Sequence, residues 1–434
     1  MAISPSLKAL DVYPIMMGGA LHGHHGEYDR RPDGGLASMK ELHCTLTNFV
    51  LPSDLPECRA LGLRAIVRQD HRSWHSTREP EEFFSQDELD RRARELVDAC
   101  RPYRDTVLAY YIFDEPSTQQ FAYIREIIEA IRRYDPDTTC FVNLYPSHAK
   151  RTQLGVDEHV EDPFGAYLQQ YADVVQPNNF IRYDNFQVSH VRGDQSEDDR
   201  QRLRSYFSDL LQVREFAFAR GLQAWNTACS CQIRPHASIP TPANLGFQAY
   251  TTLAAGYKGL AWYSFYKSTR PAADGSYYYE LSPIDAALDH ERTETFYYLQ
   301  EVNRQARLYG DRLMAMTSTG VRFRNIEPYR LSSMNVGVGE VVADAVVEGD
   351  LPLMIGEFRD PEGDRWFMVV NLDMGRTAKL RLRLQSGFTG LHSVSLGSGR
   401  LRPVRTDEAI FLAPGTGRLY KADHHTQQTG DEQL

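Results

Sequence analysis

Short apolar runs recur eight times in the first 265 residues and alternate with amphipathic segments. Near-continuous apolar character, rather than strict alternation with polar residues, is typical of parallel strands that are covered on both faces. Eight strand–helix pairs over about 300 residues predict an α/β fold of the (β/α)8 TIM-barrel type. An open doubly wound sheet is the alternative, but no glycine-rich dinucleotide turn follows the first run. The predicted strands are Val12–Met17, Leu46–Val50, Leu63–Arg68, Val107–Phe113, Cys140–Tyr145, Asp173–Gln176, Leu222–Asn226 and Gly259–Phe265.

Helix boundaries between these runs are signalled by capping residues. Ser85 with Glu88 has the spacing of a capping box and precedes apolar residues at helical intervals. The other predicted caps are Ser117 with Gln120 and Thr241-Pro242 at helix starts, and Gly221 and Gly310 at helix ends.

The pattern changes after residue 310, where short strand-like segments are separated by turn-forming residues. The run 379–384 alternates polar and apolar residues, as a half-solvated antiparallel strand does. We therefore predict a barrel over residues 1–318, a small all-β sandwich over 319–422, and a disordered tail over 423–434. The predicted strands of the sandwich are Leu351–Phe358, Arg365–Leu372, Lys379–Leu384 and Ala409–Leu412.

Composition narrows the classes of partner. Lys and Arg total 48 against 58 Asp and Glu, a net charge of −10, and no basic stripe is present, which argues against a nucleic-acid partner. No run approaches the ~20 apolar residues of a membrane span, and no signal peptide is recognisable, so we expect a cytoplasmic protein without a membrane partner. Six cysteines in 434 residues do not form a disulfide framework.

The fourth apolar run ends in two adjacent acids, Asp114 and Glu115, followed by a proline. Barrel active sites lie at the C-terminal ends of the strands, and a carboxylate pair there repels and loses hydration, which suggests a chemical purpose. The alternative is that the acids simply begin the next helix. Glycosidic bonds are cleaved with a carboxylic acid that protonates the leaving oxygen, and Glu115 is the predicted acid. In an ideal strand Asp114 would point away from Glu115, unless the strand twists or bulges.

Other predicted strand ends carry groups that suit a sugar. Indole and phenol rings stack on the C–H faces of pyranosides, while amides, carboxylates and imidazoles bind hydroxyl groups. The predicted carbohydrate-binding residues are Trp225, Trp262, Tyr263, Asn143, Tyr145, Asn179, Asp70, His71 and His22.

Three segments together resemble the barrels of clan A glycoside hydrolases, especially the family 42-like β-galactosidases. They are Asp114-Glu115-Pro116, the strand around Asn143, and residues 247–262 before the eighth strand. The helix over 292–309 and the run 367–373 are similar to that group too. The resemblance spans residues 10 to about 420 and implies a glycoside hydrolase with Glu115 as acid/base.

The chain departs from this family in two places. Asp114 stands where the family usually has Asn, and the seventh strand, 222–231, contains no carboxylate where the family has its nucleophilic Glu. Asp184 is our first choice for the second carboxylate, with Asp70 and Glu280 as further candidates. A separation from Glu115 of ~6.5–9.5 Å would indicate inversion and ~5–5.5 Å retention.

Three other functions stay open. Adjacent Asp114 and Glu115 resemble the pair of family 20 and family 123 hexosaminidases, in which the acetamido group of the substrate attacks. A carbohydrate-binding barrel that has lost catalysis is the second. The third is a metal-dependent amidohydrolase, suggested by His22, His24 and His25 but lacking the other expected ligands. We expect no metal, no cofactor and a carbohydrate ligand, and the sequence leaves room for a homo-oligomer.

Overall fold

The computed structural model describes residues 5–8, 10–22, 35–70, 74, 83–176, 180–191, 196–233, 239–266, 279–285, 291–326, 335–337, 339–405 and 407–424. All structural statements below concern these residues.

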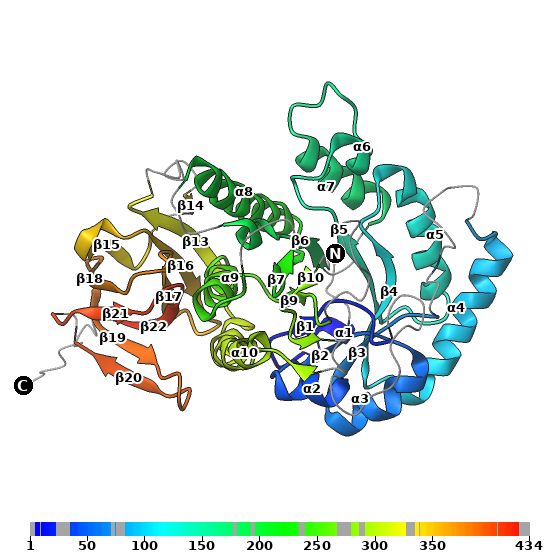
Figure 1. The fold of residues 1–434 in the computed structure, drawn as a ribbon, viewed down its shortest axis with the longest axis horizontal. Coiled ribbons are helices and arrows are strands. Elements are labelled where there is room, and N and C mark those ends of the chain that lie inside the picture. Colours follow the sequence, from blue (N-terminus) through cyan, green and yellow to red (C-terminus); the bar gives the residue numbers. More distant parts are fainter. Residues whose placement is uncertain are drawn as a thin grey trace, which may run out of the picture.

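Eight parallel strands form one sheet in the order β1-β9-β7-β6-β5-β4-β3-β2. The two end strands meet where Ala20, just beyond β1, pairs with Phe49 of β2 in a parallel bridge, so the sheet closes into a barrel. The (β/α)8 barrel followed by an all-β C-terminal region is therefore confirmed (Figure 1). The barrel strands are β1 (Ile15–Met17), β2 (Leu46–Val50), β3 (Arg64–Val67), β4 (Val107–Asp114), β5 (Thr139–Leu144), β6 (Phe180–Asp184), β7 (Gln223–Cys229) and β9 (Leu260–Tyr263).

The predicted position of the sixth strand is wrong. Residues 173 and 174 are the last turn of helix α7 (Pro163–Val174), and β6 begins at Phe180. The error has a physical cause: β6 carries Arg182 and Asp184 on the face that lines the barrel, so it lacks a continuous apolar run.

The helices begin at the predicted caps. Ser85 Oγ accepts a hydrogen bond from the backbone N–H of Glu88, and Thr241 Oγ1 accepts one from Asn244. The predicted helix end at Gly310 is wrong, because this residue lies inside α10. A Cβ there would lie 2.3 Å from the Tyr13 ring, so glycine is needed for close packing. The helices, apart from single 3-10 turns, are α1 (Pro5–Lys8), α2 (Leu36–Glu41), α3 (Leu55–Leu61), α4 (Gln86–Cys100), α5 (Phe121–Arg132), α6 (Arg151–Leu154), α7, α8 (Glu197–Ala219), α9 (Pro242–Ala254) and α10 (Glu294–Leu313).

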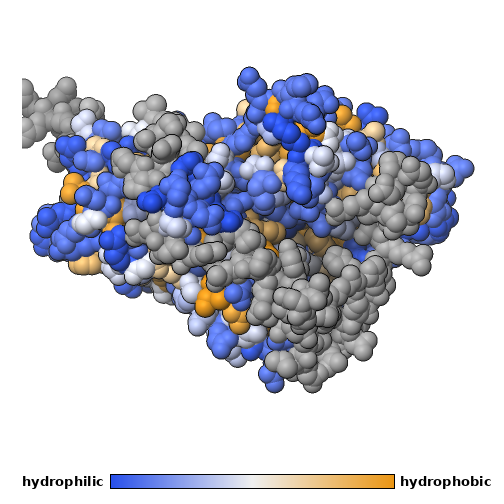
Figure 2. Space-filling view, turned by 45° about the horizontal axis from the view of Figure 1, so that its top comes forward, coloured by the Kyte–Doolittle hydropathy of each residue, from blue (hydrophilic) through white to orange (hydrophobic). Residues whose placement is uncertain are grey.

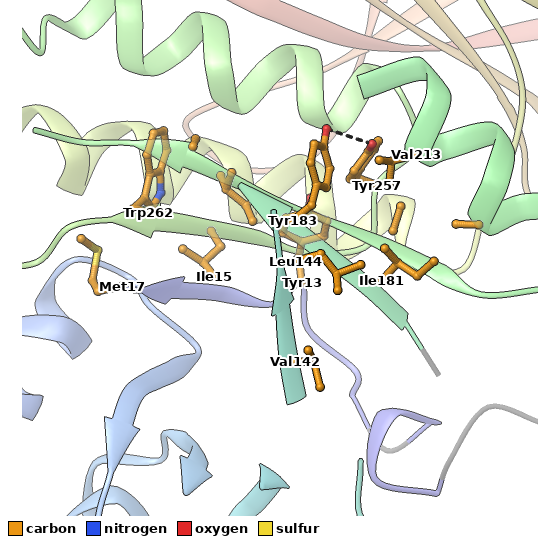
Figure 3. Close-up of a cluster of buried hydrophobic side chains, with 14 of the residues drawn as sticks. Tyr13, Ile15, Met17, Val142, Leu144, Ile181, Tyr183, Val213, Tyr257 and Trp262 are labelled. Atoms are coloured by element: carbon orange, nitrogen blue, oxygen red, sulfur yellow. Dashed lines mark hydrogen bonds between the residues drawn. The ribbon is translucent and has the colours of Figure 1, made fainter. Parts of the chain in front are cut away.

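Apolar side chains fill two separate layers of the barrel. The larger layer lies between strands and helices, where Tyr183 of β6 and Tyr257 share a hydroxyl–hydroxyl hydrogen bond of 3.2 Å (Figure 3). The smaller layer fills the barrel interior, where Phe180 stacks on Trp225 with ring centroids 4.6 Å apart. This aromatic floor leaves the C-terminal half of the interior to polar residues.

Two antiparallel sheets make up the C-terminal region and enclose a core of their own. Along β16, Leu353 and Ile355 face this core, whereas Met354 and Phe358 pack on the barrel helices. Helix α9 lies against β16, β17 and β22 (Figure 1). The strands of these sheets are β13 (Thr317–Arg324), β14 (Val336–Gly337), β15 (Val342–Val347), β16 (Leu353–Arg359), β17 (Arg365–Asn371), β18 (Ala378–Leu384), β19 (Phe388–Val394), β20 (Leu401–Val404), β21 (Ile410–Leu412) and β22 (Gly417–His424). Four further two-residue strands lie outside these sheets: β8 (Gln232–Ile233), β10 (Tyr279–Glu280), β11 (Ile284–Asp285) and β12 (Glu291–Arg292).

Hydrophilic residues dominate the coloured part of the surface shown in Figure 2, with hydrophobic residues confined to small areas between them. None of the described helices is long and apolar enough to cross a membrane. None of the six cysteines, which all lie in the described ranges, forms a disulfide, and five of them are buried.

Candidate active site at the C-terminal end of the barrel

The end of β4 brings both predicted acids to the barrel mouth. A register shift between Tyr111 and Phe113 interrupts the alternation of the strand, so that Asp114 lies beside Asn143 of β5. Glu115 then adopts φ +46°, a left-handed conformation that is uncommon for a residue with a side chain, and its N–H donates to the Asn143 carbonyl at 2.8 Å. The bulge that the sequence left open is therefore present. Strained backbone of this kind is concentrated at functional sites.

Asn143 ties two carboxylates together. Its Nδ2 donates to Asp114 Oδ1 at 2.9 Å and to Asp184 Oδ2 at 3.1 Å. An amide NH2 has two hydrogens to donate, and the two acceptor oxygens can be no more than about 6 Å apart. The structure thus brings together three residues that the sequence predicted separately.

Asp184 is the last residue of β6 and is only 6% exposed. Burial raises the pKa of its carboxyl from 3.8 to about 7, against the opposing influence of Arg182, while Asp114 adds to the increase. A carboxyl that titrates near neutrality can exchange a proton under physiological conditions, which is a common property of catalytic carboxyls.

Arg182 was missed by the sequence analysis. It lies two residues before Asp184 on the same face of β6, is 3% exposed, and its guanidinium carbon is 4.9 Å from the centre of the Phe141 ring. The signal was the alternation Phe180, Arg182, Asp184, which becomes readable only once the strand is located correctly.

Two tyrosines lie at the same end of the barrel. Tyr263, at the end of β9, is partly exposed and stacks on Phe186 with ring centroids 5.3 Å apart. Tyr145 follows β5, is 6% exposed, and lies next to Tyr167, whose hydroxyl donates to the Pro116 carbonyl at 2.7 Å. Tyr167 thereby anchors the turn that follows Glu115.

The predicted sugar-stacking tryptophans do not face solvent. Trp225 is 1% exposed and its indole N–H donates to Gln223, inside the aromatic floor. Trp262 is fully buried and donates to Asn303 Oδ1 of α10 at 2.8 Å, in the layer between strands and helices. Their role as stacking platforms is corrected to one of packing, because neither ring has a face open to a ligand.

The remaining predicted residues have other partners or are outside the described residues. Asp70 binds Arg92 at 3.2 Å, and His22 binds the buried Asp54 at 3.1 Å. His71 and Asn179 are outside the described residues. In sequence, Asn179 comes just before β6, whereas the prediction had placed it after the sixth strand. Among the described residues no group of three or more His, Cys, Asp or Glu side chains could hold a metal ion.

Comparisons with known proteins place the fold but not the family. No protein-family model matches the chain, and no curated protein sequence is detectably similar. The cold-adapted β-galactosidase from Rahnella sp. R3 matches with a TM-score of 0.50 at 10% identity, over 71% of this chain and 58% of that one. This chain thus covers well under two thirds of that enzyme. The β-galactosidase from Marinomonas ef1 (TM-score 0.47, 8% identity, 71% and 62%) and a family 27 β-L-arabinopyranosidase from Geobacillus stearothermophilus (0.47, 10%, 98% and 100%) are more distant matches. The chain shares the barrel fold of glycoside hydrolases.

Proposed function

We propose that this protein is a glycoside hydrolase that acts at the C-terminal end of its barrel. The observation that carries the proposal is the pair of hydrogen bonds from Asn143 to Asp114 and to Asp184. Asp114 directly precedes Glu115 in the sequence. Cleavage of a glycosidic bond needs a proton donor and usually a second carboxylate about 5–9.5 Å away. The shared fold supports this reading, since the Rahnella enzyme is a β-galactosidase.

In the proposed mechanism Glu115 protonates the leaving oxygen and Asp184 is the second carboxylate. Glu115 is partly exposed, so it can reach a substrate that enters from solvent. Asp184 is ionised above about pH 7, where it is a stronger base than an ordinary aspartate because its pKa is raised. Asp114 holds Asn143 in place and adds negative charge beside Asp184. Tyr145 and Tyr263 border the sugar.

The test is a panel of aryl glycosides and oligosaccharides assayed with the wild type and with Glu115→Gln and Asp184→Asn. Loss of a general acid or base typically lowers the rate by at least ~100-fold. Asp209→Asn is the matched control, because Asp209 is a buried carboxyl of α8, also with a pKa of about 7, that belongs to the layer between strands and helices. The proposal fails if the wild type hydrolyses no glycoside, or if the site variants behave like Asp209→Asn.

A substrate-assisted hexosaminidase is the second candidate. Asp114 accepts a hydrogen bond from Asn143 of the neighbouring strand, and Glu115 follows it directly, so both acids lie at the C-terminal end of the barrel. Such an enzyme needs an Asp to orient the acetamido group of the substrate and a Glu to protonate the leaving group. Asp114→Asn should then abolish turnover of N-acetylated glycosides, with Asp184→Asn much less harmful. The reverse ranking supports the two-carboxylate mechanism.

A further inference from the structure

Arg182 carries a buried positive charge without a hydrogen-bond partner. Its Nε and Nη1 atoms are sealed from solvent and make no hydrogen bond in the described structure, and no carboxylate lies within the 4.0 Å of an ion pair. Burial lowers its pKa, yet an arginine remains protonated in a protein. A buried charge without an ion-pair partner destabilises the folded state, so we expect Arg182 to have a functional role.

The groups that surround Arg182 come from strands β4 to β7. Asp114 at the end of β4, Glu115 directly after it and Asp184 of β6 itself contribute negative potential. From β5 and β7 the register neighbours are neutral: Asn143 and Trp225. The guanidinium therefore lies between an aromatic floor and the carboxylates of the proposed active site.

This arrangement does not suit recognition of an anionic substrate group. Two of the three guanidinium nitrogens are closed to any incoming atom, and three carboxyl groups nearby repel an anion. Water cannot screen the charge at those nitrogens either. What remains is an electrostatic influence on the carboxylates, which is strong where solvent is excluded.

We propose that Arg182 is a positioning residue, a buried positive charge two residues from Asp184 on the same face of β6 and beside Asn143 in register, that favours the ionised form of the Asp184 carboxylate at the mouth of the barrel. The catalytic use of Asp184 rests on the proposed function, whereas its ionisation does not. Without the arginine, desolvation and the neighbouring Asp114 would be opposed only by hydrogen bonds to the Asp184 carboxylate, among them the one from Asn143. An opposite charge within about 4–6 Å shifts a carboxyl pKa by about one to three units.

The experiment is a carboxyl 13C NMR titration of full-length protein labelled at aspartate, with the Asp184 signal assigned by its loss in Asp184→Asn. Arg182→Met removes the charge and Arg182→Lys keeps it. We expect the midpoint of Asp184 to rise by at least one pH unit, a 10-fold change in its ionisation equilibrium, in Arg182→Met and to return most of the way in Arg182→Lys.

Arg68→Met is the matched control. Arg68 is an equally buried arginine that directly follows β3, but the acid that influences its ionisation is Asp70 and not Asp184. The Asp184 midpoint should not move in this variant. Should Arg182→Met fail to fold, Arg182→Gln, which is also uncharged, is titrated in its place.

Two results would overturn the inference: an Asp184 midpoint that is the same without the Arg182 charge, or an equal shift in Arg68→Met. A shifted midpoint in a protein that hydrolyses no glycoside would leave the inference standing and refute the proposed function. If glycosides are hydrolysed, the acidic limb of the pH–rate profile should move upward with the NMR midpoint in Arg182→Met, which a merely structural arginine would not cause.

Discussion

The raised pKa of Asp184 predicts that replacing it with Asn stabilises the protein at alkaline pH. The carboxyl titrates at 3.8 in the unfolded reference and at about 7 in the folded protein, where it is buried beside Arg182 and Asp114 and bound by Asn143. Between these pH values the folded state holds a proton that the unfolded state has lost. The stability contributed by this group is therefore present at low pH and disappears as pH rises through about 7.

Its magnitude follows from the size of the shift. Each pKa unit is worth about 1.4 kcal/mol, so the contribution falls by about 3 kcal/mol between pH 4.5 and pH 8. Asp184→Asn resembles the protonated aspartate at every pH. The variant should match the wild type within about 1 kcal/mol at pH 4.5 and exceed it by about 3 kcal/mol at pH 8.

The assay is urea unfolding of both proteins at several pH values, followed by circular dichroism and tryptophan fluorescence. Asp209→Asn is again the control: burial raises the pKa of Asp209 to about 7, so it should show a similar gain at pH 8 while hydrolysis persists. The reasoning is refuted if Asp184→Asn and the wild type lose stability in parallel from pH 4.5 to pH 8.

Three further changes test separate parts of the structure. Gly356→Ala would place a Cβ 1.8 Å from the Ala254 carbonyl oxygen. Thermal unfolding should therefore show a loss of about 1–3 kcal/mol in the free energy of unfolding, and an unchanged melting temperature would contradict the close packing of α9 on β16. Trp262→Phe removes the hydrogen bond to Asn303 Oδ1 and should lower the free energy of unfolding by about 1–3 kcal/mol, with little change in the KM for glycosides. A large increase in KM would instead indicate that Trp262 contacts the sugar, as the sequence predicted. Asn143→Ala removes a hydrogen bond that lowers the Asp184 pKa, so the pH midpoint of stability should move above 7; an unmoved midpoint would rule out the bridge.

Much of the barrel could be predicted from the sequence, because most of its strands are apolar on both faces. Residues 107–113 of β4 are a clear case, since all of them are apolar and buried. β6 could not be found in this way, because the site itself places Arg182 and Asp184 in the strand. The role of Gly310 could not be predicted, because the Tyr13 ring that packs against it is almost 300 residues away in sequence.

The candidate site was predictable in its residue types but not in its geometry. Adjacent acids after a buried strand indicated Asp114 and Glu115, but the bulge that sets Asp114 beside Asn143 and the positive φ of Glu115 have no signal in the sequence. Tryptophan at a strand end indicated sugar stacking, yet residues along a strand alternate between the interior and the helix layer, and neither Trp225 nor Trp262 reaches the surface. Composition cannot distinguish these cases without the register.

The central claim is that Glu115 donates a proton to the leaving-group oxygen of the glycosidic bond. It is tested most directly by comparing substrates with different leaving groups in Glu115→Ala. A dinitrophenyl glycoside leaves without protonation, whereas an alkyl glycoside or an oligosaccharide needs the proton. The account predicts at least ~100-fold slower cleavage of the alkyl substrate and a far smaller loss on the dinitrophenyl substrate. Equal losses on both substrates, or no loss on either, would contradict it.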